Sequence, residues 1–158
     1  MSISLTVDSS DIDDVFRRLR PIFDFEAGEL MTAIAALGES QTRRRIETEK
    51  TAPDGTPWRE NTKGTSILME TGQHLLSSLA WTASADEAEW GATWEYAHVH
   101  QDGMVIVPKS AEALVFQIGG QVIHAKKVTV PARTFVGLSS DNEREIVELV
   151  TDVFGALQ

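Results

Sequence analysis

The sequence contains no cysteine and only one tyrosine. The absence of cysteine excludes disulfides, thiolate metal sites and cysteine nucleophiles, and it is typical of proteins that fold in a reducing cytoplasm. Long apolar runs are also missing, since none approaches the roughly 20 residues that a membrane-spanning helix needs. The N-terminus lacks a basic start followed by an apolar segment, so we expect no signal peptide and no membrane partner.

Basic residues are scarce as well. The chain holds 14 lysines and arginines against 24 aspartates and glutamates, which gives a formal net charge of −10 over 158 residues. Such a surface repels phosphate backbones, which argues against a protein that reads nucleic acid. With 42% apolar residues the chain can bury a core, and its length suits a single domain over residues 1–158.

Hydrophobic periodicity predicts the N-terminal elements. Apolar and polar residues alternate over residues 3–7, which predicts a short strand, and a first helix should lead up to Pro21. A second, longer helix is expected over about residues 25–50, where apolar residues recur at helical spacing. Its far half, residues 39–50, is almost wholly polar and holds Arg43-Arg44-Arg45. Two interpretations are open for this half: a solvated helix end, or a basic surface that contacts a neighbouring subunit.

A turn is expected directly after this helix. Pro53 presets one backbone angle and Gly55 accepts the unusual one, so Pro53-Asp54-Gly55 has turn chemistry. Trp58 follows, and we expect its ring to fill an apolar gap behind the turn. Residues 61–66 have the composition of a loop.

The region between residues 77 and 128 has the pattern of an antiparallel sheet. Turns are expected at residues 85–87, 108–111 and, most clearly, at Gly119-Gly120. The expected strands begin near residue 77 and then cover residues 89–93, 104–107, 113–118 and 121–128.

A C-terminal amphipathic helix is expected to follow. Ser140 and Glu143 have the spacing of a capping box. The apolar stripe of the helix consists of Ile146, Leu149, Val150, Val153, Phe154 and Leu157. The predicted fold class is therefore α+β, with an antiparallel sheet of about four to six strands between a long N-terminal helix and this C-terminal helix.

The segment from Trp94 to Gly103 holds two of the four histidines. As a strand, it would place His98 and His100 on one face with Asp102, a set that could hold a divalent metal. As a helical turn, it would instead align His98 with Asp102, and both conformations are open. The sequence has no second ligand motif such as H-E-x-x-H, which favours structural or interface histidines over a metal-dependent hydrolase.

Four motifs follow one another along the chain. They are Pro53-Asp-Gly-x-x-Trp58, Ile67-Leu-Met-Glu-Thr-Gly72-x-x-Leu75-x-Ser77-Ser78-Leu79, Tyr96-Ala97-x-x-His100-Gln101-x-Gly103 and Val130-Pro-Ala-Arg-Thr-Phe-Val-Gly137-Leu-Ser139. In this order they resemble the phage virion morphogenesis family, which includes tail completion proteins of Mu-like phages. The resemblance covers roughly residues 30–158, although Thr134 stands where that family often has a second proline. The residues that carry it are Pro53, Gly55, Trp58, Gly72, Tyr96, His100, Gly103, Pro131, Arg133 and Phe135.

The resemblance implies a structural virion protein of the head–tail junction, assembled in the bacterial host cytoplasm, with no catalytic residues and no cofactor. It implies an α+β subunit that forms a homo-oligomeric ring, for which we expect a hexamer first and a dodecamer second. The implied partners are neighbouring connector and tail proteins, with DNA passing through the lumen without sequence-specific binding. A tail terminator that caps the tail tube is the structural alternative, and a hydrolase using His98, His100 and Asp102 is the alternative of another class.

Two further expectations concern arginines. Arg43, Arg44 and Arg45 are the candidate subunit interface, because opposite charge is plentiful on an acidic neighbour. Arg133 should be held by carboxylates or backbone carbonyls, since arginine offers a planar fork of donors that lysine lacks.

Overall fold

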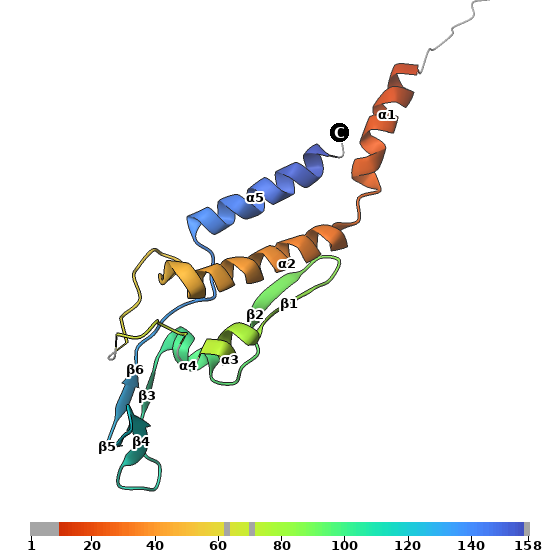
Figure 1. The fold of residues 1–158 in the computed structure, drawn as a ribbon. Helices are drawn as coiled ribbons and strands as arrows, with labels where there is room; N and C mark the ends of the chain where they lie inside the picture. Colours follow the sequence, from red (N-terminus) through yellow and green to blue (C-terminus); the bar gives the residue numbers. More distant parts are fainter. Residues whose placement is uncertain (1–9, 62–63, 70–71, 157–158) are drawn as a thin grey trace, which may run out of the picture.

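The computed structural model describes residues 10–61, 64–69 and 72–156 (Figure 1). It combines helices with small antiparallel sheets, so the α+β class is confirmed. The helices are α1 Ser10–Phe23, α2 Ala27–Arg44, α3 Gly72–Ser77, α4 Ala97–Asp102 and α5 Ser140–Gly155, and a π-helical turn, Arg45–Glu49, extends α2. Within these ranges no helix is long and apolar enough to cross a membrane. The strand predicted over residues 3–7 lies outside the described residues.

The strands do not form one sheet, so that part of the prediction is wrong. They are β1 Leu79–Ala83, β2 Ala88–Ala92, β3 Met104–Ile106, β4 Leu114–Ile118, β5 Gln121–Ala125 and β6 Val128–Val130. They pair antiparallel as β1–β2, β3–β6 and β4–β5, three separate two-stranded sheets. The return strand expected over residues 121–128 ends at Ala125, because the chain bends at Lys126 and β6 then pairs with β3 instead.

Helix α2 is the centre of the body, between the β1–β2 sheet and α5 (Figure 1). Gly38 lies where α2 crosses β2. A Cβ atom there would fall 2.3 Å from a ring carbon of Trp90. Glycine therefore lets the indole lie directly against the helix backbone.

The polar far half of α2 is not a solvated end, contrary to one of the two interpretations. Gln41 and Thr42 are buried, and so are Arg45 and Ile46 in the π-helical turn. The Gln41 amide donates to the backbone oxygen of Asn142 at 3.2 Å, and the Thr42 hydroxyl donates to the oxygen of Gly38 at 2.9 Å. The polar face is buried because the start of α5 covers it and supplies hydrogen-bond partners.

Helix α5 begins one residue earlier than predicted. Its capping box uses Ser139 and Asn142 rather than Ser140 and Glu143. The Ser139 hydroxyl accepts from the Asn142 backbone nitrogen at 3.2 Å, and the Asn142 side-chain oxygen accepts from the Ser139 nitrogen at 3.2 Å. The predicted apolar stripe faces the body only in part. Its residues Ile146, Leu149, Val150 and Val153 are half-buried, Phe154 stays 37% exposed with its ring centroid 5.1 Å from that of Phe25, and Leu157 lies outside the described residues.

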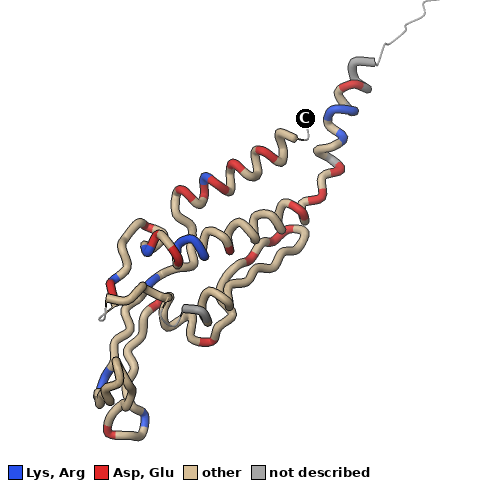
Figure 2. The backbone as a smooth tube through the Cα atoms, in the orientation of Figure 1, with Lys and Arg blue, Asp and Glu red and all other residues tan. Residues whose placement is uncertain are grey.

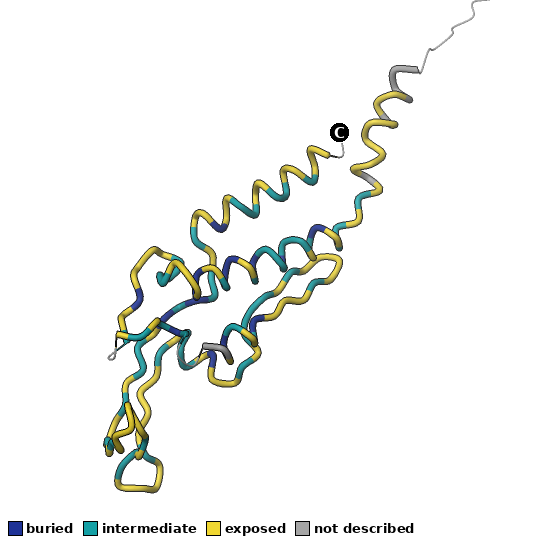
Figure 3. The backbone as a smooth tube through the Cα atoms, in the orientation of Figure 1, coloured by how far each residue is buried: buried dark blue, intermediate teal, exposed yellow. Residues whose placement is uncertain are grey.

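Two parts of the molecule stand away from this body. Helix α1, which runs on past Pro21, extends beyond the end of α2, and its residues 14, 15 and 17–22 are exposed (Figures 1 and 3). At the opposite end, β3–β6 and β4–β5 form a projection that we call the tongue, residues 104–130 (Figure 1).

Candidate functional site

The four sequence motifs meet in one hydrophobic core. Trp58 comes from the first motif, Leu75 from the second, Ala97 from the third and Phe135 from the last. The cluster, which we call the motif core, consists of Ile46, Trp58, Leu68, Leu75, Leu79, Ala97 and Phe135. The motif residues therefore hold the body together, and the burial of Trp58 at 6% exposure confirms its expected place behind the turn.

The first motif forms the predicted tight turn. Gly55 has φ +84°, and its nitrogen donates to the Ala52 oxygen at 2.9 Å. The Asp54 carboxylate accepts from the Thr56 nitrogen at 2.9 Å. Pro53 then packs on Gly137 of the last motif, where a Cβ atom would lie 2.6 Å from the proline ring. The turn is thus pinned to the chain that leads into α5.

The side chain of Arg133, in the last motif, is held in one position by hydrogen bonds, as expected. It is buried, and its Nε and Nη2 atoms both donate to the Arg59 oxygen, at 3.1 and 2.9 Å. Nη2 also donates to the Asn61 side-chain oxygen at 2.9 Å. The partners are thus a backbone carbonyl and an amide, not carboxylates. Burial, followed by the charge of Arg59, lowers the pKa of Arg133.

We expect Arg133→Lys to lower the free energy of unfolding by about 1.5–3 kcal/mol, because an ammonium cannot reproduce the two bonds that converge on the Arg59 oxygen together with the bond to Asn61. Arg59→Lys is the matched control, since it changes an exposed side chain and keeps the carbonyl that Arg133 binds. Urea unfolding followed by circular dichroism measures both. Equal stability of the two variants would show that the fork contributes nothing.

Gln101 of the third motif has a role that the sequence analysis did not assign. Its side-chain oxygen accepts from the backbone nitrogens of Phe135 and Val136 at 3.0 and 3.1 Å, and its Nε2 donates to the Val136 oxygen at 3.0 Å. Nearby, Gly103 has φ +73°, and a Cβ atom there would lie 2.7 Å from the Ala132 nitrogen. Helix α4 is therefore fastened to residues 131–137 by side-chain amide bonds and a close backbone approach.

The histidine segment is helical, so the strand alternative is wrong. His98 is exposed, with its Nδ1 2.8 Å from the Glu95 oxygen. His100 is half-buried and stacks on Trp94 with ring centroids 5.8 Å apart, and burial, followed by the charge of Arg133, lowers its pKa. In the described part of the chain, no group of three or more His, Cys, Asp or Glu side chains could hold a metal ion. The geometry gives the hydrolase hypothesis no support.

The other motif residues complete this description. Tyr96 is 53% exposed and meets the Trp94 ring edge-on at 5.6 Å. Gly72 begins α3, and Pro131 follows β6 directly, where the chain leaves the tongue.

Arg45 is buried, so it does not belong to an exposed basic surface with Arg43 and Arg44. Arg45 is 1% exposed and donates from Nη1 to the backbone oxygens of Phe135 and Gly137, at 3.1 and 2.7 Å. Its Nη2 donates to Asn142. Successive residues of a helix point about 100° apart, so three neighbours cannot share one face.

Arg43 and Arg44 lie nearer the surface and pair within the chain. Arg43 bonds the Glu39 carboxylate, and Arg44 bonds those of Glu49 and Glu145 at 3.0 and 2.9 Å. A contact between either arginine and a neighbouring subunit stays a prediction.

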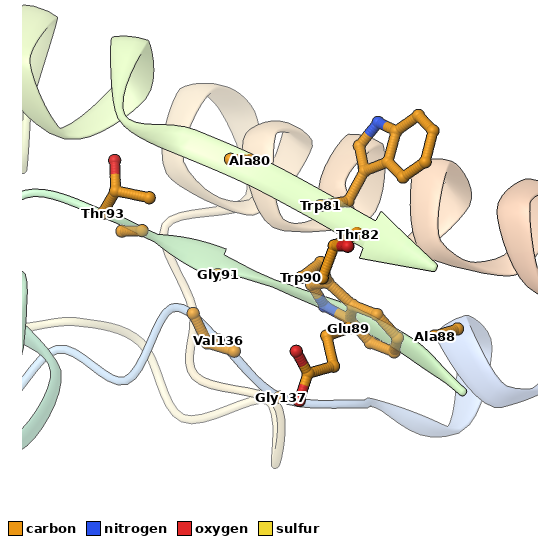
Figure 4. A pocket seen from close by; sticks show the side chains of 11 residues that line it. Ala80, Trp81, Thr82, Ala88, Glu89, Trp90, Gly91, Thr93, Val136 and Gly137 are labelled. Carbon is orange, nitrogen blue, oxygen red and sulfur yellow. The ribbon is translucent and has the colours of Figure 1, made fainter. Parts of the chain in front are cut away.

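A groove opens beside the β1–β2 hairpin (Figure 4). It has a volume of about 630 Å³, and we call it the hairpin groove. Its lining residues are Ala80, Trp81, Thr82, Ala88, Glu89, Trp90, Gly91, Ala92, Thr93, Val136 and Gly137. Trp81 and Trp90 are opposite each other in the strand register, and Trp81 remains 44% exposed. Most of the lining is apolar or small, which suits a protein segment better than a charged ligand.

Comparison with known proteins gives one match. The model of the phage virion morphogenesis family matches residues 7–155, a span that includes all four motifs. Neither the curated proteins nor the solved structures contain a match to this chain.

Proposed function

Because the chain belongs to the phage virion morphogenesis family, we propose that it is a structural protein of the head–tail junction that assembles into a ring. Family membership by itself supports a structural role in the virion rather than catalysis. Three parts of the proposal go beyond family membership. They are the location at the head–tail junction, the ring, and the contacts with neighbouring connector and tail proteins.

The main support for assembly into a ring is the amount of exposed apolar surface. Among the described residues, 15 large hydrophobic side chains are exposed, whereas only 9 hydrophobic residues are buried. The exposed residues concentrate on α1 and the tongue, which stand off the body. Large exposed apolar patches mark interaction sites in soluble proteins. A subunit that buries so little of its apolar surface alone is suited to an assembly in which neighbours cover it.

The charge distribution supports a DNA conduit. Helix α5 carries Asp141, Glu143, Glu145, Glu148 and Asp152 against a single Arg144 (Figure 2). A basic lumen would bind the phosphates through counterion release and slow the passage of DNA, whereas an acidic lumen repels them. Passage without sequence-specific binding is the behaviour that a junction ring requires.

Phage particles made without this protein test the proposal. We expect DNA-filled heads beside free tails of normal length in negative-stain images, and restored infectious particles when the protein is supplied in trans. Tails of uncontrolled length would instead indicate a tail terminator. Normal yields of complete, infectious particles would overturn the structural role.

A further inference from the structure

The tongue exposes apolar side chains on both faces of its first sheet. Successive residues of a strand point to opposite faces, so Val105 lies on one face and Met104 and Ile106 lie on the other. Their exposures are 57%, 39% and 36%. An isolated two-stranded sheet is marginally stable in water. This sheet therefore gains from a protein surface that covers it.

The distal sheet of the tongue exposes two valines on one face, beside Gln117 and His124. Val115 pairs with His124 and Val122 pairs with Gln117, so the two valines share a face of β4–β5. Their exposures are 62% and 54%. Among the described residues, 7 of the 15 exposed large hydrophobic side chains lie in the tongue: Met104, Val105, Ile106, Val107, Val115, Ile118 and Val122.

The hairpin groove offers a complementary surface. Trp90 is fixed against Gly38, whereas Trp81 leaves nearly half of its surface open. Above Gly91 a Cβ atom would meet nothing within 4 Å. Small residues on the Gly91 face of the hairpin leave room for a strand, and on the opposite face the open indole of Trp81 provides apolar area.

The charges of the two surfaces are opposite. The tongue carries Lys109, Lys126 and Lys127 against the single acid Glu112. The β1–β2 hairpin, residues 79–93, carries Asp86, Glu87 and Glu89 and no lysine or arginine. Figure 2 shows the basic positions of the tongue and the acidic positions of the hairpin at separate places on the molecule. Opposite charge of this kind favours encounter and sets register between two subunits.

The tongue cannot fill the hairpin groove of its own chain in this arrangement. Figure 1 shows the tongue projecting away from the body, while the β1–β2 hairpin points back along α2 toward its N-terminal end. Two different surfaces on different sides of one subunit make a head-to-tail contact, the kind that closes into a ring when the rotation allows.

We propose that the tongue of each subunit docks into the hairpin groove of a second copy of this chain. The proposal rests on the ring assembly proposed above and names its contact. A specific interface uses about 20–30 residues a side. One face of the tongue and the 11 lining residues of the groove would supply part of that number. The apolar faces provide the contact area, and the three tongue lysines meet the acidic hairpin.

The absence of cysteine makes the test direct. Val122→Cys in the tongue and Thr82→Cys in the groove, combined in one chain, are both at exposed positions. The double variant is supplied in trans to a phage that lacks this protein, and purified particles are oxidised and analysed on non-reducing gels. We expect a ladder of covalent oligomers whose largest band gives the ring number. Val115→Cys with Ala80→Cys is a second pair for the same contact, because Val115 shares the face of Val122.

The controls separate the contact from the assembly. Val122→Cys with Asp152→Cys places the second thiol on α5, outside the groove, and should give no ladder. A dimer from Val122→Cys alone would show tongue-to-tongue contact and overturn the proposal. Infectious particles that contain the double variants yet give no ladder would overturn the docking and leave the proposed function intact. Complete particles that contain none of the protein would overturn both.

A charge exchange gives an independent readout. Lys126→Glu with Lys127→Glu should cause loss of the ladder from the Val122–Thr82 cysteine pair, because acidic surfaces then face each other. Asp86→Lys with Glu87→Lys in the same chain should restore it. If the ladder persists in the variant with Lys126→Glu and Lys127→Glu, the tongue lysines do not meet the acidic hairpin.

Discussion

Arg45→Ala is expected to lower the free energy of unfolding by about 3–5 kcal/mol, a large share of the ~5–15 kcal/mol that stabilises a domain. The guanidinium is buried and bonds the oxygens of Phe135 and Gly137 and the side chain of Asn142. Its removal takes this donor from the oxygens of Phe135 and Gly137, while the Asn142 side-chain oxygen keeps only the Ser139 nitrogen. A buried group left unsatisfied costs about 1–3 kcal/mol. Urea unfolding followed by tryptophan fluorescence measures the loss.

Arg44→Ala is the matched control, one residue earlier in the same helix. The Arg44 side chain is 45% exposed, and its two ion pairs join Glu49 and Glu145. Exposed ion pairs contribute about 0–1 kcal/mol, so this variant should remain close to the wild type. Comparable losses in the two variants would contradict the structural role of Arg45.

The position of Arg45 also changes how the arginine interface can be tested. Glutamate at position 45 would place a carboxylate beside three oxygen atoms that now accept from the arginine, so reversing all three arginines should prevent folding. Charge reversal of Arg43 and Arg44 alone keeps the buried donor. Those two positions are the ones at which an assembly defect can be distinguished from a folding defect.

Trp58→Ala is expected to cost about 3–5 kcal/mol and to leave little soluble protein. The ring is 6% exposed and packs in the motif core. Truncation would open a cavity at the point where the four motifs meet. Thermal unfolding and soluble yield measure the effect.

Trp81→Ala removes the same side chain at a position that is 44% exposed. Because less of its surface is buried, we expect less than half of the destabilisation caused by Trp58→Ala. A Trp58 variant as stable as the Trp81 variant would show that the motif core tolerates the cavity.

Sequence periodicity predicted most elements where apolar residues face the core. The long helix, the turn at Pro53-Asp54-Gly55 and the Gly119-Gly120 hairpin all occur. The far half of α2 was misjudged as a possible solvated end because its buried residues, Gln41 and Arg45 among them, are polar. Burial of such residues depends on partners about 100 positions away, such as Asn142, which no local pattern reveals.

The candidate site could be predicted only in part, because local sequence patterns reveal buried apolar residues but not distant polar partners. The motifs marked Trp58, Arg133 and Phe135, which are all buried. The Gln101 side chain bonds backbone groups of Phe135 and Val136, and the Asn142 side chain accepts from Arg45 and from the Ser139 nitrogen. Amides in short helices and caps look like solvent-facing residues in a sequence. The division of the predicted return strand into β5 and β6 falls at one bend at Lys126, a residue that a strand pattern does not single out.

Residues 131–137 join the tongue to α5 without helix or strand of their own. Arg45, Gln101 and Arg133 nevertheless bind this short strap to α2, α4 and the loop after the turn. A hinge would absorb a pull on the tongue by bending. A strap bound at three points would instead transmit the force to α2 and α5, so the tongue and the body would move together. In a ring of such subunits, tension applied at one tongue would travel around the circumference.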